Sequence, residues 1–295
     1  MNVMTDIRFG VNFHSAADAA DFAGLVRRAE GLGFDVLAAP DHLGAMGPFT
    51  VLAAAASLSS RLRLRTYVLN AGFWNPALLA REAATLDLLS GGRVDLGIGA
   101  GHTKSEHDDA GLPWLAFPER IELLESTAID VRRRLADQGH APAALQKPVP
   151  LMIAAMSQAG LAVAARHADI VGFAGLRQLR GKPLGTFTLV SAEETAERVA
   201  AVREQAAGRD YTSDVLIQHV AIGRSPAESA ADMAASVPWM TPGEILANPF
   251  VLYAQTAGEA AEELRRRHEL YGFDSVTTHQ PSMEALGQVI AAYRG

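Results

Sequence analysis

The chain has 295 residues, of which 49% are hydrophobic and 20% charged, a composition typical of a globular protein with one large domain. It contains no cysteine, which excludes disulfides, a thiolate nucleophile and cysteine-ligated metals. A formal net charge of −7 argues against nucleic acid as a partner, and the lack of a signal-peptide pattern or a long apolar run predicts a cytoplasmic protein with no membrane segment.

Buried strands and helices alternate along the first half of the chain. Apolar runs predict strands at 7–13, 35–39, 62–70, 93–99, 149–155 and 169–174. Helical patterns are found at 48–58, 118–135 and 157–167. An earlier helix is predicted from Ser15, with Asp18 completing a capping box. A further helix opens at Asn75 and Pro76, as N-cap and first helical residue, and stops at Gly91.

The second half repeats this alternation. Strands are predicted at 214–223 and 274–280, and a last helix at 283–293. Four more capping boxes start at Ser191, Ser225, Thr241 and Thr256. Residues 178–188 interrupt the rhythm, and we place an inserted loop around 176–190.

The predicted elements favour one class of fold. Eight strands that are each followed by a helix indicate a parallel sheet. Eight such units suit a (β/α)8 barrel, or TIM barrel, better than an open sheet, although periodicity alone does not separate the two. We therefore expect a single α/β domain over residues 1–295, a (β/α)8 barrel with insertions.

Three glycines alternate at the end of the fourth predicted strand: Gly97, Gly99 and Gly101. A dinucleotide-binding fingerprint needs G-x-G-x-x-G between a first strand and a helix. Here the pattern is G-x-G-x-G, and it precedes residues 102–114, which we predict to form a loop. Gly97 fits a packing role inside a barrel. Gly99, Ala100 and Gly101 would lie at the carboxyl-end mouth, where barrel active sites occur and bare backbone lets a flat ligand approach.

Five segments carry a family resemblance. They are AEGLGFDVLAAPDH (29–42), NPALLAREAATLDLLSGGRVDLGIGAG (75–101), EHDDAGLPW (106–114), PVPLMIAAMSQAGLAVAARHADIVG (148–172) and TAGEAAEELRRRHELYGFDSVT (256–277). In these segments the chain resembles the luciferase-like monooxygenases, the bacterial-luciferase superfamily of flavin- and deazaflavin-dependent enzymes. The resemblance is weak over about 176–213 and implies a (β/α)8 barrel that is usually a homodimer.

One stretch points to a branch of that family. TYVLNAGFWNPALLAREAATLD (66–87) is most similar to the enzymes that use coenzyme F420, an 8-hydroxy-5-deazaflavin. FMN stays the alternative cofactor, because both groups share one site geometry.

Two candidate catalytic sites follow from the resemblance. It places the Asp41-His42 pair beside the cofactor ring, where the matching histidine of some deazaflavin relatives gives or takes a proton. Histidine titrates near neutral pH, and an adjacent carboxylate favours its charged form. The alternative is a Pro-Asp-His-Leu-Gly turn. His102 takes a position where some deazaflavin relatives have an acidic residue and many flavin relatives an aromatic one, so it either replaces the acid or stacks.

The cofactor ring has further candidate contacts. Asn70 and Ala71 end the third strand, and the resemblance suggests a non-proline cis peptide within 69–71. Ser105 and Glu106 could meet the polar edge of the cofactor, alongside the glycine stretch. The structural alternative is a polar strand end for Asn70 and Ala71 and a solvated loop for Ser105 and Glu106.

The phosphate side of the cofactor is assigned to the segment after the fifth strand. Ala154, Ala155, Met156 and Ser157 lead into a helix whose N-terminal N–H groups would hold an anion. Relatives usually have glycines here, so Met156 is a departure. Ser157 would bind phosphate or cap the helix.

Four other residues are candidates for the substrate pocket. Asn12 and His14 end the first strand and would face the pocket floor, while Trp74 and Trp114 would wall it; structural roles are the alternative for all four. No metal is expected, because a metal hydrolase would want His-x-His where this chain has Asn12-Phe13-His14, and consecutive loop residues such as 106–109 rarely point at one ion.

Three functions compete at this point. The first is an F420-dependent oxidoreductase acting on a small organic molecule, with His42 as acid or base. The second is an FMN-dependent monooxygenase that receives reduced flavin from a partner reductase. The third is a non-catalytic flavin-binding protein of the same fold. The residues do not identify the substrate.

Overall fold

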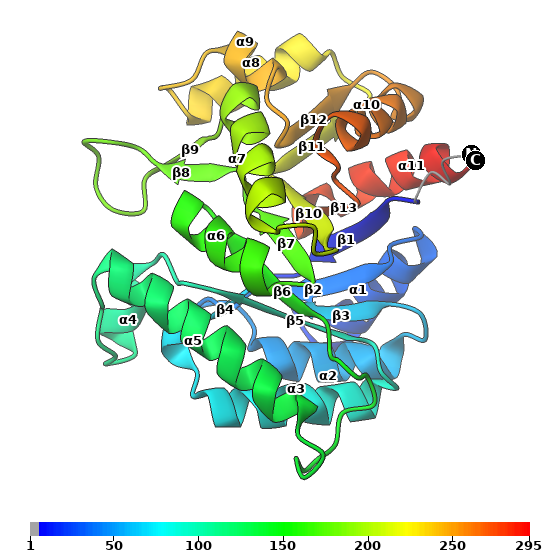
Figure 1. The fold of residues 1–295 in the computed structure, drawn as a ribbon. Helices are drawn as coiled ribbons and strands as arrows, with labels where there is room; N and C mark the ends of the chain where they lie inside the picture. The colour runs from blue at the N-terminus through cyan, green and yellow to red at the C-terminus, as the bar shows by residue number, and fades with distance from the viewer. Residues whose placement is uncertain (1–5) are drawn as a thin grey trace.

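The protein is a closed barrel of parallel strands, as the computed structural model of residues 6–295 shows (Figure 1). Its strands are β1 (Arg8–Asn12), β2 (Val36–Ala39), β3 (Arg63–Thr66), β4 (Leu69–Asn70), β5 (Val94–Gly99), β6 (Leu151–Ala155), β7 (Ile170–Phe173), β10 (Thr212–Ile217) and β13 (Ser275–His279). The sheet order is β3-β2-β1-β13-β10-β7-β6-β5-β4, and a β3–β5 pairing closes the circle. The predicted (β/α)8 barrel is therefore confirmed, with β4 as a short continuation of β3.

Helices surround the strands. They are α1 (Ala19–Gly31), α2 (Pro48–Leu58), α3 (Pro76–Ser90), α5 (Phe117–Ala136), α6 (Gln158–His167), α7 (Ala192–Gln205), α10 (Ala257–Tyr271) and α11 (Met283–Arg294). The predicted caps at Asn75, Ser191, Thr241 and Thr256 are confirmed, whereas Ser225 makes no side-chain cap hydrogen bond at the helix that begins with Pro226. Asn75 Oδ1 accepts from the N–H groups of Ala77 and Leu78 at the start of α3, and Gly91 ends that helix with φ +71°.

The first helix begins later than predicted. Asp18, and not Ser15, is its N-cap, because Asp18 Oδ1 accepts hydrogen bonds from the N–H groups of Ala20 and Asp21. Ser15 lies in the loop before the helix, where its carbonyl oxygen accepts a hydrogen bond from Gln280 Nε2 at 3.0 Å.

Two predicted strands are split. The run 62–70 breaks between β3 and β4, and the non-proline cis peptide lies there, at Tyr67–Val68, rather than within 69–71. The run 214–223 leaves the barrel at Gln218, whose N–H donates to Phe250 O at 2.7 Å. The rest of that run is β11 (His219–Ile222), which pairs in parallel with β12 (Val251–Ala254), a strand too short to stand out in the sequence.

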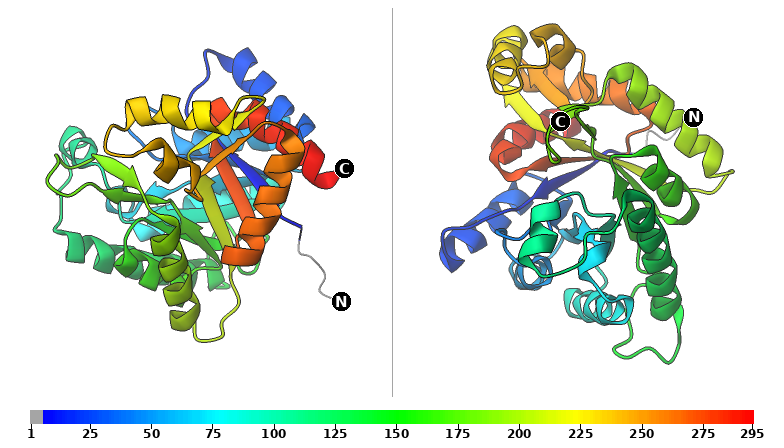
Figure 2. Two further views of the ribbon diagram at one scale, coloured as in Figure 1. Left: turned by 90° about the horizontal axis from the view of Figure 1, so that it is seen from above. Right: turned by 90° about the vertical axis from the view of Figure 1, so that its left-hand side faces the viewer.

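Three insertions decorate the barrel (Figure 2). Residues 102–114, predicted as a loop, contain the short helix α4 (Lys104–Asp109), which a Lys104–Asp108 ion pair one turn apart supports. The interruption after β7 is an antiparallel hairpin of β8 (Leu176–Gln178) and β9 (Phe187–Leu189). Helices α8 (Pro226–Ser236) and α9 (Pro242–Leu246) lie with β11 and β12 at one end of the molecule, yellow to orange in the figures.

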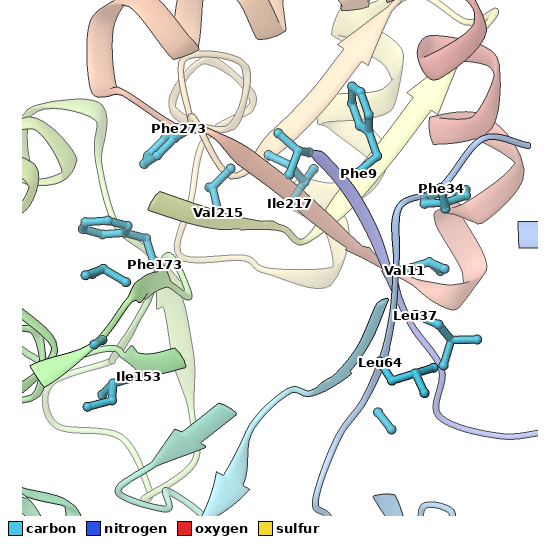
Figure 3. Packing of buried hydrophobic residues seen from close by; sticks show 14 of the residues in the cluster. Phe9, Val11, Phe34, Leu37, Leu64, Ile153, Phe173, Val215, Ile217 and Phe273 are labelled. Carbon is cyan, nitrogen blue, oxygen red and sulfur yellow. The ribbon is translucent and has the colours of Figure 1, made fainter. Parts of the chain in front are cut away.

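Side chains alternate between two cores along each strand. The larger core includes Val11, Leu37 and Leu64 from the strands (Figure 3). The same cluster contains the buried residues of the surrounding helices. A smaller cluster takes neighbouring positions, such as Ala38 and Leu216, which the alternation turns toward the barrel interior.

A buried polar network fills part of that interior. Arg65 has 1% of its surface exposed and donates to Asp214 Oδ2 at 2.7 Å and to Asp95 Oδ2 at 3.1 Å. The hydroxyl of Tyr67 donates to the other oxygen of Asp214 at 2.6 Å. Ser275 donates to Asp214 as well, at 2.6 Å. These buried hydrogen bonds fill the barrel interior below its carboxyl-end mouth.

Candidate active site

A cavity of about 1160 Å³ opens at the carboxyl ends of the barrel strands. It is lined by residues at or just after the carboxyl ends of β1, β2, β4, β5, β6, β7, β10 and β13, together with parts of α5, α7 and the β8–β9 hairpin. Most of the predicted site residues are among them: Asn12, His14, Asp41, His42, Asn70, Gly99, Ala100, Gly101, His102, Glu106, Ala154, Ala155, Met156 and Ser157. Four do not line it: Ala71, Trp74, Ser105 and Trp114.

His42 and Glu106 form a hydrogen-bonded pair at this cavity. His42 Nδ1 lies 2.7 Å from Glu106 Oε1, and 39% and 13% of the two side chains are exposed. A carboxylate only accepts hydrogen bonds, so Nδ1 carries the hydrogen and Nε2 of the neutral ring keeps its lone pair. The carboxylate beside His42 is therefore Glu106. From the sequence we expected Asp41 to be the carboxylate next to His42 and Glu106 to contact the cofactor. The sequence did not predict the short helix that directs Glu106 toward His42.

Asp41 holds the strand ends together. Its Oδ2 accepts hydrogen bonds from Asn70 N at 3.0 Å and from Trp74 Nε1 at 2.9 Å. Trp74 also packs edge-on against Phe49, with ring centroids 5.2 Å apart. These contacts explain why Trp74 supports the wall from behind rather than forming its surface.

Asn70 is fixed from the other side by a residue that the sequence did not single out. Asn70 Nδ2 lies 2.9 Å from His107 Nε2, and His107 Nδ1 lies 3.0 Å from Pro113 O. The carbonyl requires a hydrogen on Nδ1, so Nε2 accepts from the Asn70 amide. Trp114 packs edge-on against the His107 ring and lies under the Arg120 guanidinium, away from the cavity lining.

His102 stands between His42 and the hairpin. Its ring meets those of His42 and Phe187 edge-on, with centroids 5.3 Å and 5.5 Å away. Burial lowers the pKa of His102 to about 4, and the nearby His42 adds to this effect. His102 is thus uncharged at neutral pH, unlike the acidic residue that some relatives carry in its place.

The glycines of β5 make room for protein as well as for a ligand. A Cβ on Gly99 would lie 2.8 Å from Val68 Cγ2 and 3.3 Å from Ala154 O. A Cβ on Gly97 would collide with Thr66 O, and one on Gly101, where φ is +70°, would collide with the Asn70 amide. The Val68 side chain next to Gly99 and the Asn70 side chain next to Gly101 therefore both depend on the absence of a Cβ at these glycines.

This packing gives a testable difference. We expect Gly99→Ala to lower the free energy of unfolding by about 1–3 kcal/mol, because the added methyl group presses on Val68. The double variant with Val68→Ala should recover most of that loss. Urea unfolding measures both. A double variant no more stable than Gly99→Ala would mean that Val68 is not what the glycine accommodates.

The segment after β6 has the predicted capping geometry. Ser157 Oγ accepts from Gly160 N at 3.1 Å and is the N-cap of α6. A Cβ on Gly160 would lie 2.7 Å from that of Ala155, so the first turn packs directly on the strand end. Because Ser157 and Met156 line the cavity, the N-terminus of α6 is open to an anionic group.

The cavity floor includes two residues that the sequence did not predict. His14 Nε2 lies 3.1 Å from His279 Nδ1, and His279 Nε2 lies 3.2 Å from Gln218 Oε1. His279 ends β13 and Gln218 follows β10, so the strand-end rule that selected Asn12 and His14 could have found both. Burial lowers the pKa of His279 to about 4, with a further contribution from His14.

The two buried histidines predict acid sensitivity. An unfolded histidine binds a proton near pH 6.5, whereas His102 and His279 do so only near pH 4. Stability is therefore lost as the pH falls from 6.5 to 4. We expect each residue to remove about 2 kcal/mol by pH 5, as urea unfolding at pH 7 and pH 5 would measure. His102→Gln and His279→Gln should flatten this dependence; an unchanged slope would contradict the assignment.

The hairpin, α5 and α7 bring arginines to the rim of the cavity. Glu194 Oε1 accepts from Arg198 Nη2 at 2.7 Å, and Glu194 Oε2 lies 3.4 Å from Arg177 Nε. Arg120 Nη1 donates to Leu115 O at 2.8 Å, and burial lowers the pKa of Arg120. These residues were outside the predicted site, because nothing in the sequence aligns them with a strand end.

Residues 6–295 contain neither a cluster of metal ligands nor a helix that could cross a membrane. No group of three or more His, Asp or Glu side chains is placed to hold a metal ion within that range. Every helix in the same range is too short or too polar to cross a membrane.

The chain belongs to the luciferase-like monooxygenase family, whose sequence pattern matches residues 1–289. A 119-residue stretch is 40% identical to an F420-dependent glucose-6-phosphate dehydrogenase of Intrasporangium calvum and covers 37% of this chain and 35% of that one. A pyrimidine monooxygenase of Cronobacter sakazakii is 31% identical over 190 residues, 59% of this chain and 52% of that protein. The chain thus matches about a third to a half of the length of these curated relatives.

The fold recurs in solved structures. An F420-dependent secondary alcohol dehydrogenase, in complex with an F420-acetone adduct, superimposes with a TM-score of 0.78 at 16% sequence identity. The superposition covers 98% of this chain and 100% of the other. This likeness concerns the fold.

Proposed function

We propose that the chain is an oxidoreductase that uses coenzyme F420 for hydride transfer to or from a small organic substrate. The observation that carries the proposal is the His42–Glu106 pair at the mouth of a (β/α)8 barrel. The second imidazole nitrogen of His42 has no hydrogen-bond partner among residues 6–295 and can exchange a proton with a substrate. The names of the F420-dependent relatives support the choice of cofactor.

The cavity fits such a cofactor by its donor groups and its shape. Gly99, Ala100 and Gly101 offer bare backbone for a flat ring, and the N-terminus of α6 with Ser157 offers N–H groups for a phosphate. When bound, coenzyme F420 supplies a ring carbon that takes or gives a hydride.

The protein's own part is to move a proton and to hold the reactants. His42 Nε2 accepts the proton of a substrate hydroxyl in the oxidation direction and returns it in the reduction direction. Glu106 orients the ring through Nδ1 and stabilises the imidazolium. His102, uncharged beside it, excludes water and adds no competing positive charge.

Two fluorescence titrations on the full chain test this proposal, one with coenzyme F420 and one with FMN. Tight binding of F420 alone supports hydride transfer. Tight binding of FMN alone would overturn the proposal in favour of the monooxygenase, which the pyrimidine monooxygenase relative makes the second candidate. If neither cofactor binds below about 100 µM, equivalent to about −5.5 kcal/mol, the family membership would stand without a cofactor-dependent activity.

Four further properties of this protein are predictions that the present observations do not test. They are the homodimer, a reductase partner for the FMN alternative, a cytoplasmic location and the non-catalytic flavin-binding alternative. Binding of F420 without turnover of any alcohol, imine or alkene would favour the last of these.

A further inference from the structure

We propose that Asn12, His14, Gln218 and His279 form a second polar subsite, which binds an O–H or N–H group of a neutral substrate and disfavours anions. This floor subsite rests on the proposed function only in that the cavity takes a small organic substrate. It lies on β1, β10 and β13, whereas the His42–Glu106 pair lies on the segments after β2 and β5.

A one-way chain of hydrogen bonds fixes the protons of the floor subsite. Gln218 Nε2 donates to Ala174 O at 2.8 Å, which orients the amide so that Gln218 Oε1 must accept. His279 Nε2 therefore carries a hydrogen and donates to that oxygen. His279 Nδ1 is then the bare nitrogen of a neutral ring, and His14 Nε2 must donate to it.

The end of this chain faces the cavity as an acceptor. With its hydrogen on Nε2, neutral His14 keeps a lone pair on Nδ1, which has no hydrogen-bond partner among residues 6–295. Burial lowers the pKa of His14, and the nearby His42 lowers it further, so the ring remains neutral. Protonation of His279 is opposed in the same way by burial and by His14.

Asn12 supplies the second observation. Its side chain is buried, with 3% of the residue exposed, and it lines the same cavity. Asn12 Oδ1 has no hydrogen-bond partner within the described part of the chain. A buried polar atom without a partner costs free energy, so a ligand that supplies a donor is favoured at this place.

Together these groups define a chemical class. Two neutral acceptors favour a hydroxyl, an amide N–H or another uncharged donor, and neither can stabilise a negative charge. Among these four residues the Asn12 amide alone could donate to a carboxylate or phosphate, and no cation would offset the hydration that the anion loses. We infer that the substrate is a neutral molecule with a second donor group besides the one that reacts at His42, such as a diol.

The test compares two probes that differ in one group, propane-1,2-diol and lactate. Nitrogen-15 NMR of the imidazoles in the full chain reports the tautomers directly, before any probe is added. We expect His14 and His279 both to carry hydrogen on Nε2. The diol should then shift the His14 Nδ1 signal at concentrations where lactate has no effect.

Variants localise the effect. His14→Phe should weaken diol binding about tenfold, the equivalent of one hydrogen bond. His219→Phe is the matched control, because His219 packs on Tyr253 outside the cavity. Hydrogen on His14 Nδ1, a response to lactate at lower concentration than to the diol, or no response to either probe would overturn the floor subsite.

These outcomes are independent of the cofactor. The measurement contains neither F420 nor FMN, so a failed F420 titration together with the expected tautomers and diol preference would remove the proposed function and leave the floor subsite. Tight F420 binding with the opposite tautomers would do the reverse.

Discussion

Replacing His42 by alanine should lower kcat by about a hundredfold or more while leaving the affinity for the cofactor unchanged. The reason is that His42 Nε2 is the proton-exchanging atom in our proposal, whereas the backbone of β5 and the N-terminus of α6 hold the cofactor. The measurement pairs a fluorescence titration of F420 with steady-state rates on a substrate that the wild-type chain turns over. Unchanged turnover would remove His42 from the mechanism.

Glu106→Gln is the matched variant for this experiment. The glutamine oxygen can still accept from His42 Nδ1, so the ring keeps its orientation but loses the neighbouring negative charge. We expect kcat to fall by less than in His42→Ala. An equal loss in both variants would indicate that charge on Glu106, rather than the histidine alone, governs the proton transfer.

The second large effect concerns stability. Asp214→Asn should lower the free energy of unfolding by about 3–5 kcal/mol, because it breaks a buried ion pair and leaves Arg65 with Asp95 as its remaining carboxylate. The near-identical shape of asparagine separates the loss of charge from the loss of volume. Urea unfolding at neutral pH is the measurement.

An exposed aspartate–arginine pair serves as the control for that variant. Asp232 contacts Arg224 at 2.9 Å with more than half of each side chain exposed. Asp232→Asn should change stability by less than about 1 kcal/mol, since solvent screens such pairs. Similar losses in the two variants would show that burial is not what makes the Asp214 network important.

The fold could be predicted because its signals are local and redundant. Each barrel strand is a short apolar run, and caps such as Asn75 and Thr256 mark where helices begin. Predictions were wrong where contacts distant in sequence decide the outcome. The barrel strand stops before Gln218 because the backbone of Gln218 binds Phe250, and Ser15 does not cap the first helix because its backbone binds the Gln280 side chain.

The candidate site was predictable to the extent that barrels place active sites at strand ends. That rule selected Asn12 and Gly99, the family resemblance selected Asp41 and His42, and all four line the cavity. It says nothing of which side chains pair. The partner of His42 is 64 positions away on a helix too short to detect by periodicity, so its carboxylate could not be identified from spacing.

Helix α4 has a consequence for how this protein can change in length. Two adjacent residues of this short helix make hydrogen bonds to different strand ends of the barrel. Glu106 binds His42, which follows β2, and His107 binds Asn70, which ends β4. Removing one residue between Gly101 and Glu106 would turn the helix by about 100° and misdirect both side chains together. Surface connections usually tolerate such deletions. This one should accept replaced residues more readily than lost or gained ones, so its length, more than its composition, is under constraint.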